Sequence, residues 1–477
     1  MPSVGSGPFV VLGGGPCGLA AAAELAEAGH RPIVLEREAL VGGLCATHEK
    51  DGWRFDLGGH RFVSSDAAMS RRLERLLKDD LLSQERRSVV LHEGRRFRYP
   101  LEAGDLVKNL GVRENVRALA GYARARVDAK LRRHDELTFE DWVVARFGRP
   151  LYDTFFGPYT QKLWGMDPRL LSADWAAERI SLLDLGDAAL RLAGVRRAPV
   201  RTYARRYLYP RLGMGQLYER MAGEITARGG EVRTGARVVG LETSDDRVVA
   251  VRVESSRGAE RLPVGELLAT APLPELVRWL RPNRTDASDR AAHSLRFRAL
   301  VFLVLFLRRS DFSENTWMYV ASRDLTMSRI QEPKRRSRWM SPEGRTSLML
   351  EIPCDVGDAT WCASTLELKE RMLRELAALG FGVDDVLDAT SVRVEHGYPV
   401  YHLGYEEERQ ALVREVARFR NVRTAGRQGL FRYVFMDAAM QMGVEAARQM
   451  IAGEPGGRGL DAIGRSSSVV EARALTA

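Results

Sequence analysis

The chain has 477 residues, of which 45% are hydrophobic and 28% are charged, as expected for a folded protein with one large core or two coupled cores. Its net charge of +9 reflects either a bias towards arginine or an anionic cofactor or substrate, and the scattered basic pairs, such as Arg71–Arg72 and Arg335–Arg336, predict no nucleic-acid partner. No apolar run of about 18 residues occurs, so no membrane span is expected.

The N-terminal segment reads as a strand, a glycine turn, a helix and a second strand. The first eight residues lack a basic region and a long apolar stretch, so residues 9–13 are predicted to be a strand rather than part of a signal peptide. The pattern G-x-G-x-x-G follows and opens a helix over about residues 15–28. The second strand, residues 31–36, ends at an acid, Glu36.

Each part of this unit has a physical role in binding a dinucleotide. Gly13 permits a tight turn, Gly15 lets the backbone approach the pyrophosphate, and Gly18 lets the helix pack closely on the strand. The helix N-terminus offers free N–H groups to the phosphates. Glu36, eighteen residues after Gly18, can accept hydrogen bonds from ribose hydroxyls. The segment therefore predicts a Rossmann-type binding unit.

The residues after Glu36 bear on the choice between NAD and FAD. Arg37 follows the acid directly, and the pair Gly42–Gly43 comes six residues after Glu36. This second close backbone approach resembles the two-part signature of flavoproteins in the amine oxidase and protoporphyrinogen oxidase superfamily. The resemblance implies that the cofactor is FAD and that its adenosine half is held here.

The rest of the chain contains several further predicted elements. Residues 66–150 show helical periodicity, residues 155–165 an aromatic loop or broken helix, and residues 207–215 a loop before a helix over 216–228. Strands are predicted at 231–234, 237–243, 248–255, 267–271, 298–307 and 347–353. A last helix ends near Gly453.

We predict an α/β protein with a Rossmann-type FAD-binding domain and a mixed α+β substrate domain, both discontinuous. The FAD-binding domain is expected to comprise residues 1–75, 205–290 and 420–453. The substrate domain is expected to comprise residues 76–204 and 291–419. Residues 454–477, rich in glycine and serine, are predicted to be a loose tail.

Several segments in order resemble the branch that contains UDP-galactopyranose mutase-like and protoporphyrinogen oxidase-like flavoproteins. They are residues 56–62, 159–165, 398–405, 426–427 and 436–437. The resemblance implies that one loop lies over the flavin ring, that a second approaches the ribityl chain, that a helix N-terminus faces the pyrimidine edge, and that a valine touches adenine. The residues concerned are Gly59, His60, Arg61, Gly426, Arg427, Met436, Asp437 and Val238.

Two residues are candidates for catalysis and five for substrate binding. His60 is a candidate proton carrier, because its ordinary pKa is near 6.5, or else a backbone-bonded spacer that shapes its loop. Arg427 is a candidate for holding the flavin or an anionic substrate, or else forms a salt bridge. The candidates for the substrate pocket, whose aromatic members are alternatively core residues, are Tyr159, Trp164, Tyr319, Arg329 and Tyr433.

The leading functional hypothesis is an FAD-dependent oxidoreductase that removes a hydride from an amine, an alcohol or a ring C–H of a small substrate, for example a sugar or nucleotide conjugate. The alternatives are a sugar isomerase or mutase that works with reduced flavin and a flavin-binding protein without turnover. The mutase carries an arginine in a Pro-Val-Arg segment, which residues 179–183 do not match, and a tyrosine where this chain has Phe431.

Four cysteines without metal-binding spacing predict neither a disulfide framework nor a metal site, and they suit the cytoplasm.

Overall fold

A parallel sheet of five short strands carries the N-terminal glycine turn. The structure is a computed structural model that describes residues 7–64, 66–99, 105, 108–131, 137–180, 206–280 and 286–467. The strand order is β19-β13-β1-β2-β9, and all neighbouring strands are parallel. In that order the strands are Val422–Thr424, Glu266–Ala269, Phe9–Leu12, Ile33–Leu35 and Glu231–Arg233.

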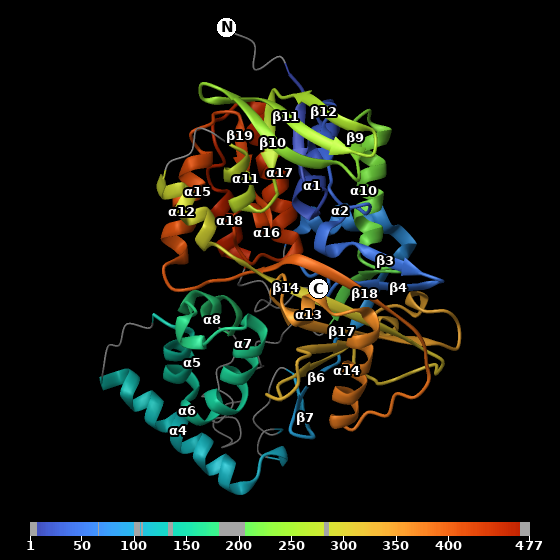
Figure 1. Ribbon diagram of the computed structural model, residues 1–477, viewed down its shortest axis with the longest axis vertical. Coiled ribbons are helices and arrows are strands. Elements are labelled where there is room, and N and C mark those ends of the chain that lie inside the picture. The colour runs from blue at the N-terminus through green and yellow to red at the C-terminus, as the bar shows by residue number, and fades with distance from the viewer. Residues whose placement is uncertain are drawn as a thin grey trace.

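Three helices pack together beside this sheet. Helix α1 (Pro16–Glu27) contacts both α10 (Gly215–Ala227) and α17 (Met436–Ala452). Small residues make this packing close, because a Cβ on Gly443 of α17 would lie only 2.0 Å from the carbonyl oxygen of Cys17. The first and last helices of the FAD-binding region expected from the sequence therefore meet in space, as Figure 1 shows in its upper half.

The same half contains a three-stranded antiparallel sheet and a group of shorter helices (Figure 1). The strands β10 (Arg237–Ser244) and β11 (Arg247–Ser255) form a hairpin through the predicted turn, where Asp245 has a positive φ of 51°. Further elements of this half include β12 (Gly258–Pro263), α2 (Ala67–Leu77), α11 (Leu273–Trp279), α12 (Asp286–Ser294), α15 (Tyr405–Val416) and α16 (Gly426–Gly429).

The other half is built on a seven-stranded mixed sheet of order β18-β14-β17-β16-β15-β6-β7. Its long central strands are apolar along most of their length, and pairs such as Leu303 with Leu350 lie side by side in the core. In sheet order the strands are Val386–Pro399, Phe297–Leu307, Thr346–Cys354, Arg329–Gln331, Trp317–Val320, Ser88–His92 and Arg95–Arg98.

Figure 1 shows one group of helices to the left of this sheet and two further helices in front of it. One group lies beside it and consists of α4 (Val112–Leu131), α5 (Phe139–Phe147), α6 (Arg149–Leu151), α7 (Gly157–Trp164) and α8 (Ala173–Ile180). Helices α13 (Ala359–Cys362) and α14 (Thr365–Ala378) pack on the sheet through residues such as Leu368 and Met372. This arrangement confirms the predicted α/β class with a second, mixed α+β part. The domain boundaries stay a prediction.

Some predicted elements were wrong. The segment expected to be helical contains three strands, β5 (Leu81–Glu85), β6 and β7, because β6 pairs with β15, more than 200 residues later. Residues 207–210 of the expected loop belong to strand β8 (Arg206–Pro210), which pairs with β5. The aromatic segment is the broken helix of the two alternatives, since a π-helical turn at Tyr152–Phe156 precedes α7.

The predicted loose tail is also partly wrong, because residues Leu460–Ser467 form helix α18 on α17. Leu460 is fully buried, and Asp461 binds the buried guanidinium groups of Arg409 and Arg432. Helix α18 therefore supplies both apolar burial and a counter-charge that the composition of the tail did not reveal. Residues 468–477 of the tail, and residues 181–183 of the segment compared with the mutase, lie outside the described residues.

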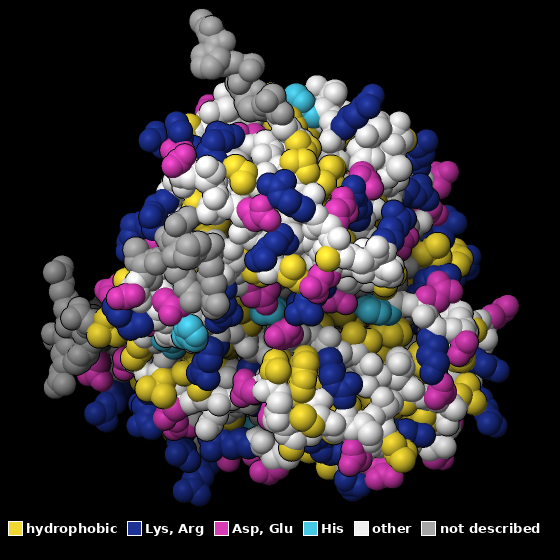
Figure 2. All heavy atoms as spheres, turned by 45° about the horizontal axis from the view of Figure 1, so that its top comes forward, with side chains coloured by type: hydrophobic (Ala, Val, Ile, Leu, Met, Phe, Trp, Pro, Cys, Tyr) yellow, Lys and Arg dark blue, Asp and Glu magenta, His cyan; other side chains and the backbone are white. Residues whose placement is uncertain are grey.

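The described ranges contain no helix long and apolar enough to cross a bilayer. They also hold no cluster of three or more metal-binding side chains. All four cysteines are free thiols. Figure 2 shows that, on the face it presents, Lys and Arg side chains are interspersed with Asp and Glu rather than gathered into one basic stripe.

Candidate active site

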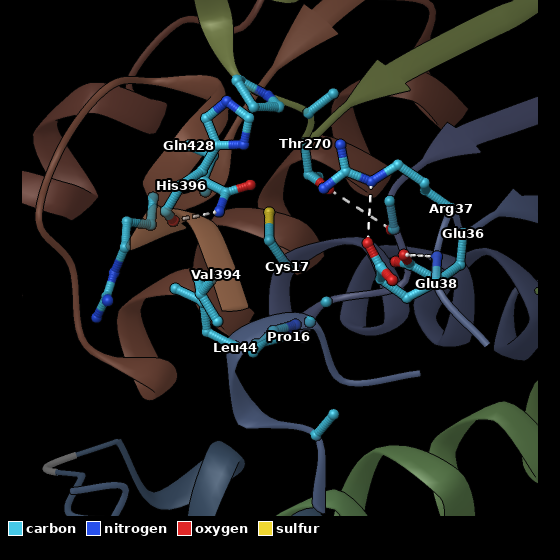
Figure 3. Close-up of a pocket in the computed structure, with 18 of the residues that line it drawn as sticks. Pro16, Cys17, Glu36, Arg37, Glu38, Leu44, Thr270, Val394, His396 and Gln428 are labelled. Carbon is cyan, nitrogen blue, oxygen red and sulfur yellow. Dashed lines mark hydrogen bonds and ion pairs between the residues drawn. The ribbon is translucent and has the colours of Figure 1, made fainter. Parts of the chain in front are cut away.

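A cavity of about 770 Å³ lies where the N-terminal glycine turn, β13, β18 and the C-terminal segment meet. Figure 3 shows Glu36, which follows β2, Thr270, which follows β13, His396 of β18 and Gln428 of the C-terminal segment around one space. Two of them are tied to the backbone, since Thr270 Oγ1 donates to the carbonyl of Leu12 over 2.8 Å and Gln428 Nε2 to that of His396 over 2.9 Å. The cavity opens at the carboxyl ends of parallel strands, where ligands of this kind of sheet bind.

The three motif glycines face different surroundings. Gly13 has a φ of +102°, and a Cβ there would lie 2.3 Å from Thr270 Oγ1. A Cβ on Gly18 would lie 2.0 Å from the carbonyl oxygen of Gly13, so this glycine is needed for packing. A Cβ on Gly15 has no protein atom nearer than 4.0 Å and would point into open space. Gly15 therefore leaves room for a ligand rather than for the protein.

Glu36 organises the turn as well as lining the cavity. Its side chain is buried, and its two oxygens accept hydrogen bonds from the backbone N–H groups of Gly14 at 2.7 Å and Glu38 at 2.8 Å. Burial raises the pKa of the Glu36 carboxyl, and these two N–H groups act in the opposite direction. The second glycine pair is in contact with the same turn, because the N–H of Gly42 donates to the carbonyl of Gly14 over 2.7 Å.

The remaining predicted cofactor residues divide between this cavity and a second one. Gly18 and Gly42 support the turn without lining either cavity, and Gly59, Arg61 and Asp437 line the second cavity instead of the first. Those that line the first cavity are Gly13, Gly15, Glu36, Arg37, Gly43, His60, Val238, Gly426, Arg427 and Met436.

The two cavities share part of their walls. Arg427 lies at this junction, donates to the carbonyl of Val434 over 2.9 Å and stacks on the ring of Tyr433 at 4.2 Å. Helix α17 starts here at Met436, and its N-cap residue provides no side-chain hydrogen bond. The junction therefore combines a guanidinium with the positive end of a helix. The shared residues are Leu44, Leu57, His60, Arg427, Phe435 and Met436.

His60 is engaged by the protein through both ring nitrogens. Nε2 lies 2.9 Å from the carbonyl oxygen of Leu57, and Nδ1 lies 3.7 Å from Sγ of Cys45. Burial, together with the positive charge of Arg427, lowers the pKa of His60 to about 3. Burial also raises the pKa of the Cys45 thiol to about 12, so a neutral imidazole that accepts from the thiol and donates to Leu57 is consistent with all contacts.

The second cavity, of about 300 Å³, has a wall rich in aromatic side chains. Its tyrosines contact one another, with ring centroids 6.2 Å apart for Tyr159 and Tyr319 and 5.7 Å for Tyr398 and Tyr433. Burial raises the pKa of Tyr159 to about 12, which keeps this phenol neutral. Four of the five predicted substrate residues, namely Tyr159, Tyr319, Arg329 and Tyr433, line this cavity.

Trp164, the fifth, does not line it. Its indole packs edge to face on Trp175 at 4.7 Å, and Trp175 forms part of the wall. Trp164 is 3% exposed and belongs to the hydrophobic core behind the cavity. The aromatic motif on α7 presents one side to the cavity, where Tyr159 and Thr160 lie, and Trp164 lies on the other side.

A buried ion pair supports the charged part of this wall. Arg329 Nη1 lies 2.9 Å from Oε2 of Glu351, which is fully buried, and Tyr398 donates to the other oxygen over 3.1 Å. Arg61 and Arg86 stack on Trp317 at 5.3 Å and 5.4 Å. Glu351 was not among the predicted site residues, although a carboxylate inside an otherwise apolar strand is a detectable sign of a buried partner.

A five-stranded parallel sheet, two glycine motifs in contact and a cavity at their edge define a dinucleotide-binding protein. Residues 16–451 match the family of flavin-containing amine oxidoreductases, and the chain belongs to that family. Its cofactor is FAD.

The chain is 28% identical over 307 residues to a phytoene dehydrogenase of Streptomyces griseus. The matched region covers 57% of this chain and 55% of that protein. It is 55% identical over 51 residues to human all-trans-retinol 13,14-reductase, covering 11% of this chain and 8% of that protein. It thus spans less than two thirds of either curated relative.

Two solved structures share the fold over most of their length. Reduced UDP-galactopyranose mutase superposes with a TM-score of 0.82 at 22% identity, over 98% of this chain and 99% of the other. A putative protoporphyrinogen oxidase from Exiguobacterium sp. 255-15 superposes with a TM-score of 0.70 at 20% identity, over 94% and 99%. The fold predicted from the sequence therefore also occurs in these two solved structures.

Proposed function

We propose that this protein oxidises a C–H bond of a small substrate that carries an apolar body and no positive charge. The observation that carries the proposal is the shared wall between the two cavities. A dinucleotide with its adenosine end beside Glu36 and Val238 would extend along the first cavity towards Arg427. The aromatic cavity opens from that same place and is where a substrate would lie.

The residues of the first cavity fit FAD at both ends. Open space beside Gly15 and the uncapped start of α1 suit the pyrophosphate, and the buried Glu36 carboxylate suits a ribose. When bound, the flavin would accept a hydride from the substrate, and O₂ or another acceptor would later reoxidise the flavin. Arg427 and the N-terminus of α17 would favour negative charge at the junction.

The wall of the second cavity argues for the class of substrate. Four arginines, Arg61, Arg86, Arg329 and Arg427, line it, whereas Asp437 is the one acid among the lining residues. Burial raises the pKa of the Asp437 carboxyl, which weakens its negative charge further. A cationic amine would therefore meet net positive charge, while a neutral or anionic molecule with an apolar or ring-shaped body would stack on the tyrosines.

His60 is proposed to shape the loop over the junction rather than to carry a proton. A neutral imidazole whose two nitrogens are already bonded has no free proton to donate near neutral pH. Its bond to Leu57 O holds the segment that includes Gly58 and Gly59, both of which line the second cavity. This role is that of a backbone-bonded spacer, which is one of the two interpretations of His60 that the sequence allows.

Anaerobic stopped-flow spectroscopy tests the proposal. Oxidised holoenzyme is mixed with apolar alcohols, carboxylates, amines and nucleotide sugars, and flavin absorbance is followed. We expect absorbance to be lost with a neutral or anionic compound and retained with the matched cationic amines. Reduction by the amines alone would contradict the substrate class. Conversion of a nucleotide sugar to an isomer only after reduction with dithionite would replace the oxidoreductase by the mutase alternative.

A further inference from the structure

Helix α4 presents a strip of apolar side chains to solvent. Val112 is 83% exposed, Val116 61%, Leu119 59% and Val127 54%, although a packed helix normally hides such residues. At about 100° per residue, these four side chains and the exposed Ala120 and Ala123 fall within an arc of about 100° on the helix surface. We call these six residues the α4 strip.

The strip points away from the protein because the opposite face of α4 is held in place. Ala125 is buried, and a Cβ on Gly121 would lie 2.4 Å from Cδ of Pro150 in α6. A Cβ on Gly148 would likewise lie 2.5 Å from the carbonyl carbon of Gly121, so α4 is packed too closely to rotate and hide the strip. Figure 1 shows α4 along the outer edge of the helical group, on the side away from the five-stranded sheet.

Arginines border the strip on both sides. By the same helical geometry, Arg113, Arg117 and Arg124 follow one edge and Arg126 lies at the other, and all four are exposed. Glu114 and Asp128 lie beyond the arginines, and Asp128 pairs with Arg124 at 3.7 Å. An exposed apolar surface with a cationic border is the arrangement of helices that lie in the interface of a membrane.

We infer that the α4 strip docks on the surface of an anionic lipid bilayer. The valines and the leucine would enter the boundary between headgroups and acyl chains, and the arginines would meet the lipid phosphates. A second copy of the chain is the other candidate for this face. Two α4 strips placed face to face would bring their arginine borders together, so like charges oppose that contact.

Co-sedimentation of the full holoenzyme with vesicles tests the inference. One set of vesicles contains phosphatidylglycerol and phosphatidylcholine in equal amounts, and the other contains phosphatidylcholine alone. We expect binding to the anionic vesicles that weakens with added salt, since exposed charges are screened. Replacing Arg117 and Arg124 by Gln should weaken that binding by about fivefold per arginine.

The decisive variant is Val116→Glu with Leu119→Glu, which should lower vesicle affinity more than tenfold. Both side chains are exposed, so FAD content and the thermal midpoint should not change. Leu366→Glu on α14, where the leucine is 63% exposed, is the matched control and should bind vesicles like the parent protein.

The inference would be overturned if the parent protein bound neither kind of vesicle. It would also be overturned if Leu366→Glu lost as much vesicle affinity as the double variant. So would a dimer in light scattering that dissociates in the double variant without any vesicle binding, because a second copy would then be the occupant.

Discussion

The carboxylate of Glu36 accepts a hydrogen bond from the backbone N–H of Gly14 over 2.7 Å, so the acid at the end of β2 also holds the glycine turn that follows β1. A ribose contact and the shape of the turn are therefore coupled through one side chain. Conservative substitution at this position should disturb both.

Replacing Glu36 by Gln is expected to weaken FAD binding by about tenfold to over a hundredfold, which corresponds to roughly 1.5–3 kcal/mol for a charged hydrogen bond. The amide can accept with only one of its two terminal atoms, whereas the carboxylate accepts from Gly14 and from Glu38. Titration of the apoprotein with FAD measures the effect. Glu314→Gln, at an acid that is 87% exposed, is the control, and equal affinities in both variants would refute the assignment.

Two glycines of the same motif should respond differently to valine. Gly15→Val is expected to give a folded protein that cannot retain FAD, because its side chain enters open space in the cavity. Gly18→Val should fail to fold, because its Cβ would overlap the carbonyl oxygen of Gly13 at 2.0 Å. Circular dichroism and flavin content distinguish these outcomes, with Gly223→Ala, which meets no atom within 4 Å, as the tolerated control.

The lowered pKa of His60 predicts a pH dependence of stability. The unfolded chain takes up a proton on His60 near pH 6.5, whereas the folded protein does so only near about pH 3. The free energy of unfolding should therefore fall as the pH decreases from 6.5 towards 3. His60 alone should contribute up to about 1.4 kcal/mol per pH unit to this decline.

The His60→Asn variant should show a shallower decline over the same range in urea unfolding. His293→Asn, at a histidine whose side chain is 67% exposed, is the comparison. Identical slopes for the parent protein and His60→Asn would show that His60 is already charged in the folded state.

The buried pair of Arg329 and Glu351 should show strong coupling. Arg329→Met leaves the Glu351 carboxylate, which is 0% exposed, without its counter-charge and should cost about 3–5 kcal/mol of unfolding free energy. The double variant with Glu351→Leu should be less destabilised than the sum of the two single variants. Urea unfolding of all four proteins gives the coupling energy, and simple additivity would contradict the contact.

The predictions that succeeded depend on local chemistry. The strand–turn–helix–strand unit that contains Gly13, Gly15 and Gly18 could be predicted because its glycine spacing and its apolar runs lie within one short segment. The aromatic character of the second cavity was also visible, since Tyr159, Tyr319 and Tyr433 do line it.

The predictions that failed depend on distant partners. Strand β6 is set by its pairing with β15, and helix α18 by the charges of Arg409 and Arg432, none of which is close in sequence. Glu351 belongs to the site only because β16 and β17 place Arg329 opposite it. Local periodicity carries no information on such long-range pairing.

Strand β18 belongs to the seven-stranded sheet, yet its residues 392–396 line the first cavity while Gly397 and Tyr398 line the second. A single rigid segment thus touches both places where ligands would bind. Any displacement of this strand on occupation of one cavity alters the walls of the other, and thermodynamic linkage requires the effect to be reciprocal. Cofactor retention and substrate affinity should therefore change by the same factor, which makes FAD release a reporter of substrate occupancy.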